Sequence, residues 1–359
     1  MDFNRDESQD AVAEVVVSLL ERNSARDSEL WPAIVDSGLL AVALPERFGG
    51  DDMGLLEVSA MLTELATDAV QVPALATLGF GVLPLVGRIP DALAEKIFPA
   101  VSKGAVLTAA LNEPGAPFAM KPETTAVADG AVARISGRKI AVPYADRAQW
   151  MLVPTDSGIA VVEADTPGVT LVASPASTGA PEFSVHLERA EIPAEQLLTE
   201  GSGSPLLADL HRLALASIGA VADGLLKGVL TLTAEHVRTR HQFGRPLAEF
   251  QAVAQQIGDV YVVSRTLHAA ALSANWALAQ QDQSPEHRER VDDDLDVLAY
   301  CVASDLPAAM QKCHHLHGGI GVDMTHPLHR YYSQAKDIAR WLGGASFRLD
   351  RLGARCSST

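Results

Sequence analysis

The spacing of apolar residues changes twice along the chain, first from a helical period to alternation and then back. Residues 8–22 and 54–68 carry apolar side chains at i, i+3, i+4 and i+7, which is typical of amphipathic helices. In the middle of the chain apolar and polar residues alternate. Asp-Gly, Ser-Gly and Pro-Gly pairs recur there, as they do between short antiparallel strands. This order predicts an α+β fold that is mainly α.

Three domains follow from the pattern: a helical domain at residues 1–104, an antiparallel β domain at 105–200 and a helical bundle at 201–359. The bundle is expected to contain four long helices, at about residues 205–236, 247–282, 288–314 and 325–352. An acidic run, "RVDDDLD", stands at the expected start of the third helix, where the helix dipole favours negative charge.

Composition limits the classes of ligand that the chain can bind. The 359 residues are 48% hydrophobic and 20% charged, which is typical of a globular protein, and their formal net charge is -17. Such an acidic chain is poorly suited to nucleic acid or an anionic membrane as its main partner. An anionic ligand would therefore need a local cluster of basic residues.

Cysteine usage and the apolar runs predict a cytoplasmic protein. Cys301, Cys313 and Cys356 are odd in number and lack the spacing of metal ligands, so a disulfide framework is not expected. The N-terminal residues are charged and polar, unlike a signal peptide. The most apolar run, residues 213–234, is interrupted by Asp223 and Lys227, so we expect no membrane span.

The stretch "RTRHQFGRPLAEFQ", residues 238–251, is the first candidate site. Gly244 and Pro246 interrupt two helical segments, and Arg240 could present its planar guanidinium group to a pyrophosphate. The turn at Phe243 and Gly244 could let the backbone approach a ligand closely. An alternative is a simple helix end at which arginine side chains complement the dipole.

The stretch "CHHLHGGIGVDMTHPLHRYY", residues 313–332, is the second candidate site. Its glycines predict a loop that can pack closely against a flat or phosphorylated ligand. Its five histidines, at positions 314, 315, 317, 326 and 329, raise the alternative of a metal site. Because glutamates and further cysteines are missing nearby, we expect capping and packing histidines and no metal.

Six stretches, in this order and spacing, resemble the acyl-CoA dehydrogenase family over nearly the whole chain. They are "LAVALPERFGG", "LNEPGAP", "ISGRKIAV", "LERAEIPAEQLL", "RHQFGRPLAEFQAVAQQIGD" and "LHGGIG…HPLHRYYSQAK". The resemblance implies the acyl-CoA dehydrogenase fold, with an N-terminal helical domain, a central antiparallel β domain and a C-terminal four-helix bundle. It also implies bound FAD and oxidation of an acyl-CoA thioester to its trans-2-enoyl form, in which a carboxylate removes the α-proton and flavin N5 accepts the hydride.

The carboxylate that this chemistry requires is missing from both places where the family carries it. An α-proton of a thioester is weakly acidic, so a general base must stand beside it. One family position follows the "RYY" helix, and here it is Leu342. The other lies on the first bundle helix, and here it is His211. The resemblance therefore assigns no catalytic residue to this chain.

Groups that face the flavin ring in the family are also missing. Where the family has Trp-x-Thr, the sequence reads "AVPY", with Ala141 and Pro143 at the two positions. The family's Glu-Pro-Gly-Ala-Gly-Ser-Asp becomes "EPGAPFA", with Pro117 and Phe118 in its last turn. Ala141 and Pro143 offer neither an aromatic ring that stacks on the flavin nor a hydroxyl group for N5.

Residues that the family directs toward the flavin of a neighbouring subunit are retained. The resemblance implies that they bind the pyrophosphate and adenosine end of FAD across a subunit interface. The set comprises Arg240, Gln242, Phe243, Gly244, Gln251, His315, Gly318 and Gly319. His315 departs from the glutamine that is usual in the family.

This selective retention predicts a non-catalytic subunit of a hetero-oligomeric acyl-CoA dehydrogenase, which completes the FAD site of a catalytic partner in an α2β2 assembly. The resemblance is to small partner chains in actinobacterial oxidation of steroid side chains, so a polycyclic acyl-CoA bound mainly by the partner is implied. Electron-transfer flavoprotein is the expected acceptor. Two alternatives remain: a self-sufficient dehydrogenase with His211 as an unusual base, and a scaffold or ligand-binding protein without redox function.

Overall fold

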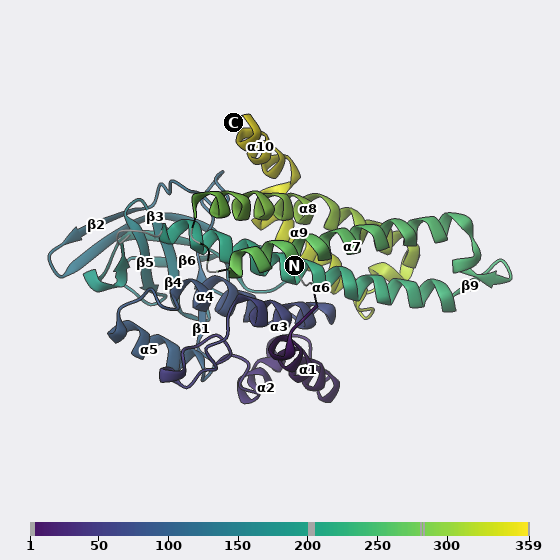
Figure 1. Cartoon of the computed structure of the whole chain (residues 1–359), viewed down its shortest axis with the longest axis horizontal. Helices are drawn as coiled ribbons and strands as arrows, with labels where there is room; N and C mark the ends of the chain where they lie inside the picture. Colours follow the sequence, from purple (N-terminus) through teal and green to yellow (C-terminus); the bar gives the residue numbers. More distant parts are fainter. Residues whose placement is uncertain (1–3, 200–204, 281, 283, 358–359) are drawn as a thin grey trace. The chain divides into compact units, whose positions relative to one another are not determined.

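The protein's structure, a computed structural model, describes residues 4–199, 205–280, 282 and 284–357, without the side chains of 356 and 357. Helices come first, strands occupy the middle, and helices return after residue 205 (Figure 1). This order confirms the predicted α+β fold, which is mainly α. The domain limits expected at residues 104 and 200 stay predictions.

The chain folds as two compact units, which combine segments distant in sequence. Met1–Val17, Ser59–Val70 and Ile218–Thr359 form one of them, here called the bundle unit. Ser18–Val58 and Gln71–Ser217 form the other, here called the sheet unit. Three helices, α1 (Glu7–Arg22), α3 (Leu55–Thr67) and α6 (Leu206–Thr239), contribute residues to both units.

The sheet unit contains two sheets of four strands. One sheet has the order β1-β4-β5-β8, and its strands are Val106–Ala109, Ala148–Thr155, Gly158–Glu163 and Leu197–Leu198. The other has the order β2-β3-β7-β6, and its strands are Thr125–Asp129, Val132–Pro143, Glu182–Pro193 and Val169–Ala173. Within the described sheets the pairing is antiparallel as expected, except that β1 and β4 run parallel. Alternation of apolar residues does not encode strand direction, so the sequence could not reveal this exception.

Short helices complete the sheet unit. They are η1 (Ser28–Leu30), α2 (Trp31–Asp36), η2 (Glu46–Phe48), η3 (Leu75–Val82), α4 (Leu83–Leu85), α5 (Asp91–Val101) and η4 (Ala194–Gln196). The η3 segment is a π-helix that lies close to the first sheet. A Cβ atom at its Gly81 would lie 2.4 Å from the Leu107 side chain on β1, so only glycine permits this approach.

Long helices make up most of the bundle unit. After α6 come the hairpin strands β9 (His241–Gln242) and β10 (Arg245–Pro246), the turn η5 (Leu247–Glu249), α7 (Gln251–Ala279), α8 (Pro285–His317), η6 (Gly318–Val322), α9 (Leu328–Trp341) and α10 (Gly344–Ser357). Gly224 and Gly228 let α6 pack closely on α3. A Cβ atom at Gly228 would lie 2.0 Å from the Thr67 carbonyl oxygen, which also accepts a 2.7 Å hydrogen bond from the Tyr331 hydroxyl of α9.

Two details of the predicted bundle are wrong. The helix expected at 325–352 is two helices, α9 and α10, because Gly343 and Gly344 adopt positive φ of 85° and 81° and end the first helix. The helix expected to start at residue 288 starts earlier, at Pro285, after the N-cap Ser284. The acidic run therefore lies beyond the first turn of α8, where Asp293 pairs with Arg355 of α10 at 2.6 Å.

Helix α6 is the one described helix that is long and apolar enough to cross a membrane by length and composition. Its most apolar window is 83% buried within the protein. A core helix passes the same test, so this result is weak support for a membrane span.

Candidate dinucleotide and active-site positions

The predicted ligand-binding stretch at residues 238–251 forms a β-hairpin between α6 and α7 (Figure 1). Gln242 pairs with Arg245, which leaves Phe243 and Gly244 as a two-residue turn. Both turn residues have positive φ, 53° and 82°, as a type I′ turn requires. Glycine adopts this conformation freely, whereas phenylalanine is strained in it, which often accompanies a functional constraint.

The hairpin presents its side chains to solvent. Phe243 is 91% exposed, and Arg240, Gln242 and Gln251 are exposed as well. Phe250 packs against the hairpin. Its ring centroid lies 6.2 Å from that of Phe243 and 4.2 Å from the Arg245 guanidinium carbon. An exposed phenylalanine beside exposed arginines is a surface suited to another molecule that carries both a ring and an anion.

The Gly-Gly loop at the end of α8 is similarly open. The Gly318 backbone N–H caps the helix by donating to the carbonyl oxygens of His314 and His315. A Cβ atom at Gly318 or Gly319 would meet nothing within 4 Å, and the His315 side chain is exposed. All eight predicted cofactor-binding residues therefore lie at the surface of the bundle unit.

Stacked histidines connect the hairpin segment with the Gly-Gly loop. The rings of His236 and His317 have centroids 4.3 Å apart and planes inclined by 20°, and the His326 ring lies 5.1 Å from that of His317. The packing function expected for His317 is confirmed, whereas His236 was not singled out by the sequence. The available signal was its position one helical turn before Arg240, on the same face of α6.

The first family base position offers no acid-base group. Leu342 caps α9, is fully buried, and its carbonyl oxygen accepts a 2.8 Å hydrogen bond from Nε of Arg348. An aliphatic side chain in an apolar core cannot abstract a proton.

The second family base position, His211, is covered by the residues that replace the family's polar turn. Its side chain is 5% exposed, and its ring meets that of Phe118 edge to face with centroids 5.3 Å apart. Its Nδ1 lies 3.2 Å from the Met120 sulfur atom. Phe118 is itself 3% exposed, so apolar side chains cover this imidazole.

Backbone geometry on the flavin-facing strand is unusual even though the polar groups are missing. Ala141 has a φ of 55° and Phe118 a φ of 51°, both in the left-handed region. The Pro143 carbonyl oxygen accepts a 2.8 Å hydrogen bond from the Thr108 hydroxyl, and the Phe118 N–H donates to Oδ1 of Asn112. These contacts hold the loops in place without offering a donor to a flavin ring.

A buried ion pair fixes the loop that carries Phe118. Oε1 of Glu113 accepts hydrogen bonds from Nζ of Lys139 at 2.7 Å and from the Thr124 hydroxyl at 2.6 Å, and its other oxygen accepts from the Glu123 N–H. Burial raises the pKa of Glu113, but these donors outweigh it and lower that pKa to about 2. The carboxylate is therefore engaged in structure and cannot serve as a base at neutral pH.

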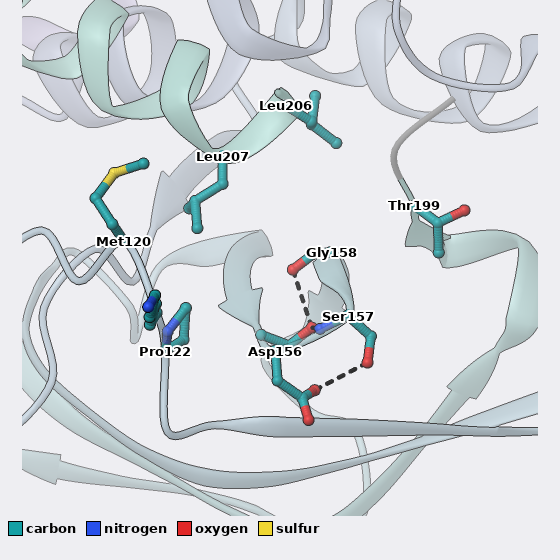
Figure 2. Close-up of a pocket in the computed structure, with 10 residues that line it drawn as sticks. Met120, Pro122, Asp156, Ser157, Gly158, Thr199, Leu206 and Leu207 are labelled. Atoms are coloured by element: carbon teal, nitrogen blue, oxygen red, sulfur yellow. Dashed lines mark hydrogen bonds between the residues drawn. The ribbon is translucent and has the colours of Figure 1, made fainter. Parts of the chain in front are cut away.

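A pocket of about 500 Å³ opens in the sheet unit beside the same loop (Figure 2). Met120 and Pro122, the β4–β5 turn at Asp156 and Ser157, and Leu207 of α6 line it. The Asp156 carboxylate accepts hydrogen bonds from the Ala126 N–H and from the Ser157 hydroxyl. The pocket is thus lined by both polar and apolar residues. Its carboxylate, Asp156, already accepts two hydrogen bonds from the protein.

Among the described residues, no cluster of three or more His, Cys, Asp or Glu side chains could hold a metal ion. Cys301 and Cys313 are free thiols, and burial raises the pKa of both, that of Cys313 to about 11. The side chain of Cys356 lies outside the described residues.

Comparisons with known proteins agree with this architecture. The family model for the N-terminal domain of acyl-CoA dehydrogenase matches residues 2–105, and the model for the C-terminal domain matches residues 210–355. Acyl-CoA dehydrogenase FadE28 of Mycobacterium tuberculosis is 46% identical over 359 residues, which cover 100% of both chains.

Two solved structures are also similar. The crystal structure of the ChsE4-ChsE5 complex from Mycobacterium tuberculosis has a chain that is 30% identical, with a TM-score of 0.88 and 100% of both chains covered. A variant of the Tcur3481-Tcur3483 steroid ACAD has a chain that is 29% identical, with a TM-score of 0.83 and 98% of both chains covered.

Proposed function

The chain belongs to the acyl-CoA dehydrogenase family, and we propose that it acts there as a non-catalytic subunit that completes the FAD site of a catalytic partner. One observation carries the proposal: both family base positions are closed. Leu342 is buried and apolar, and His211 is packed under Phe118 and Met120. In contrast, the hairpin that follows Arg240 is formed, and the side chains of Arg240 and Phe243 are exposed to solvent.

The open set fits one end of a dinucleotide. A pyrophosphate is bound well by a guanidinium group and by backbone N–H groups that glycines leave accessible. Arg240 supplies the first. At Gly318 and Gly319 a Cβ atom would meet nothing within 4 Å, so a ligand can approach the backbone closely, although the Gly318 N–H itself caps α8. When bound, FAD supplies the hydride acceptor of the family reaction. On this chain we assign Arg240, Gln242, Phe243, Gly244, Gln251, His315, Gly318 and Gly319 to holding its pyrophosphate and adenosine end.

The ring end of a flavin does not fit the corresponding positions of this chain. Ala141 and Pro143 carry no aromatic ring and no hydroxyl group, and the Pro143 carbonyl oxygen already accepts a hydrogen bond from Thr108. Phe118 fills its own loop with an apolar side chain. We therefore assign the ring, the catalytic carboxylate and most of the acyl-CoA contacts to the partner subunit.

The similar complexes support a partner of the same family. ChsE4-ChsE5 is a complex, and Tcur3481-Tcur3483 is a steroid ACAD. We propose an α2β2 assembly in the cytoplasm, a steroid side-chain CoA ester as substrate and electron-transfer flavoprotein as acceptor. Closing half of the active sites would leave room for a substrate too wide for a symmetric assembly.

A self-sufficient dehydrogenase with His211 as its base is the main competing function. Imidazole is chemically able to remove a proton. The contacts of His211 with Phe118 and Met120 disfavour this function, because a base must reach the substrate proton within hydrogen-bonding distance. His211→Ala in the assembled complex separates the two: a supporting subunit keeps turnover, whereas a self-sufficient enzyme loses it.

Expression of the chain alone and together with its catalytic partner tests the proposal. We expect the isolated chain to purify without tightly bound flavin and without dehydrogenase activity, and the co-expressed pair to have both. Flavin absorbance and reduction of an artificial electron acceptor in the presence of an acyl-CoA are the measurements. Tight flavin and turnover in the isolated chain would overturn the proposal.

A further inference from the structure

The two segments assigned to the dinucleotide come from distant parts of the sequence, and a pair of histidines joins them. His236 lies one turn before Arg240 on α6, and the Arg240 N–H donates to its carbonyl oxygen at 2.9 Å. His317 is the last residue of α8 and directly precedes Gly318. Because the two rings stack at 4.3 Å, the position of the hairpin depends on that of the Gly-Gly loop.

The hydrogen bonds of His317 define its neutral form. Nδ1 lies 2.9 Å from the Cys313 carbonyl oxygen, which can only accept, so Nδ1 carries the proton. Nε2 is buried and has no hydrogen-bond partner among the described residues, and the whole side chain is 5% exposed. A second proton on Nε2 would be a buried donor without an acceptor, which is costly.

Surrounding groups add to this cost, because most of them are cationic or become so in acid. Arg240 directly follows the end of α6, His314 comes from α8, and His326 precedes α9. Tyr332 of α9 lies against His314. The Asp323 carboxylate interacts with His326 and His329 and accepts a hydrogen bond from the Thr325 hydroxyl. Burial, followed by neighbouring charges, lowers the pKa of His236. Burial likewise lowers the pKa of His317, to about 4.

Building on the proposed function, we propose that His236 and His317 are positioning residues for the dinucleotide. Their stacked neutral rings hold the Arg240 hairpin against the Gly318–Gly319 loop, and their protonation separates the two segments and releases the cofactor. Two cationic rings cannot remain stacked beside Arg240 and His326 without a counterion. The folded chain favours the neutral rings. The stack is therefore lost progressively as the pH falls below 6.5, the ordinary pKa of histidine.

The pH dependence of FAD binding by the assembled complex tests the inference. The Kd for FAD is measured by fluorescence from about pH 7.5 to about pH 5, the range in which histidines titrate. The critical variant is the double substitution His236→Phe and His317→Phe, which keeps two stacked rings but cannot be protonated. His287→Phe, which changes a histidine at the other end of α8, is the matched control.

We expect acid to raise the Kd of the wild-type complex about tenfold more than that of the Phe-Phe variant, which corresponds to a difference of about one pKa unit. His287→Phe should follow the wild-type profile. The same pH profile in the Phe-Phe variant, or tighter FAD binding in acid, would overturn the inference. Exchange of the imidazole C2 hydrogens in the wild-type complex gives a second readout. Equal, ordinary pKa values near 6.5 for both histidines would overturn the inference even if the Phe-Phe variant did not fold.

Failure of the inference and failure of the proposed function give different results. Arg240→Ala should weaken FAD binding at neutral pH, whereas Arg238→Ala should not, because Arg238 already pairs with Glu235. If Arg240→Ala leaves the Kd unchanged, this chain does not hold the dinucleotide and both ideas fall. If Arg240→Ala weakens binding but the Phe-Phe variant titrates like the wild type, only the positioning by histidine is wrong.

Discussion

At the scale of single residues, Glu113 carries the clearest electrostatic prediction. Its carboxylate and the Lys139 ammonium group are 3% and 1% exposed, so each is the other's main compensation for burial. Glu113→Gln removes one charge and leaves Lys139 as a buried cation, which we expect to lower the free energy of unfolding by about 3–5 kcal/mol. Glu191→Gln is the matched control. Its carboxylate pairs with Arg134 but is 58% exposed, so its loss should cost under about 1 kcal/mol.

The same pair makes stability depend on pH in acid. The pKa of Glu113 falls from its ordinary 4.5 to about 2 on folding, so the folded chain binds fewer protons than the unfolded chain between these values. Its contribution is complete above pH 4.5 and is lost as the pH falls to about 2. When the free energy of unfolding in urea is plotted against pH across this range, the slope should be shallower for Glu113→Gln than for the wild type. An identical slope would contradict the buried pair.

The absence of carboxylates at the two family base positions could be predicted from the sequence, but the contacts of the residues that stand there could not. Leu342 and His211 stand at motif positions where the resemblance implies a carboxylate, so their identity alone led to the prediction that the base is missing. That Phe118 and Met120 close over His211 required the structure, because residues distant in sequence meet only after folding. The stack of His236 on His317 was hidden for the same reason.

At the scale of elements, periodicity predicted the helices and strands, and glycines decided where it failed. Helices α1 and α3 lie where the apolar spacing placed them, and the long strands β3 and β7 lie in the part of the chain where apolar and polar residues alternate. The break between α9 and α10 was missed, because apolar residues keep a helical spacing on both sides of Gly343 and Gly344. A glycine pair in the left-handed conformation ends a helix without changing the apolar pattern around it.

Close helix packing yields a prediction at this scale. A Cβ atom at Gly228 of α6 would lie 2.0 Å from the Thr67 carbonyl oxygen and 2.6 Å from the Tyr331 ring. Because a backbone atom cannot move aside cheaply, Gly228→Ala should destabilise the chain by about 1–3 kcal/mol or more. Gly258→Ala in α7 is the control: nothing lies within 4 Å of its Cβ, so better helix propensity should stabilise the chain by about 0.5–1 kcal/mol. Thermal unfolding measures both, and equal effects would contradict the close contact between α6 and α3.

At the scale of the whole molecule, the two halves of the family's cofactor site differ in how well this chain preserves them. The pyrophosphate-directed set lies in the bundle unit and is exposed, whereas the ring-directed positions lie in the sheet unit and carry no suitable groups. On the proposed assignment, such a chain completes a flavin site only on another subunit. The formal charge of -17 makes the local arginines of the hairpin more important, because the remaining surface repels a pyrophosphate.

This asymmetry predicts the cofactor content of the assembly. Each flavin needs one ring-directed half and one pyrophosphate-directed half, and of the two possible combinations only the partner's ring half with this chain's hairpin is complete. We therefore expect about one FAD for each pair of unlike chains, or about half of what a symmetric tetramer of the family would hold. Flavin absorbance after denaturation, divided by protein mass from native mass spectrometry, gives the ratio. About one FAD on every chain would mean that the ring half of this subunit is functional, and the closed positions at His211 and Leu342 would then need another explanation.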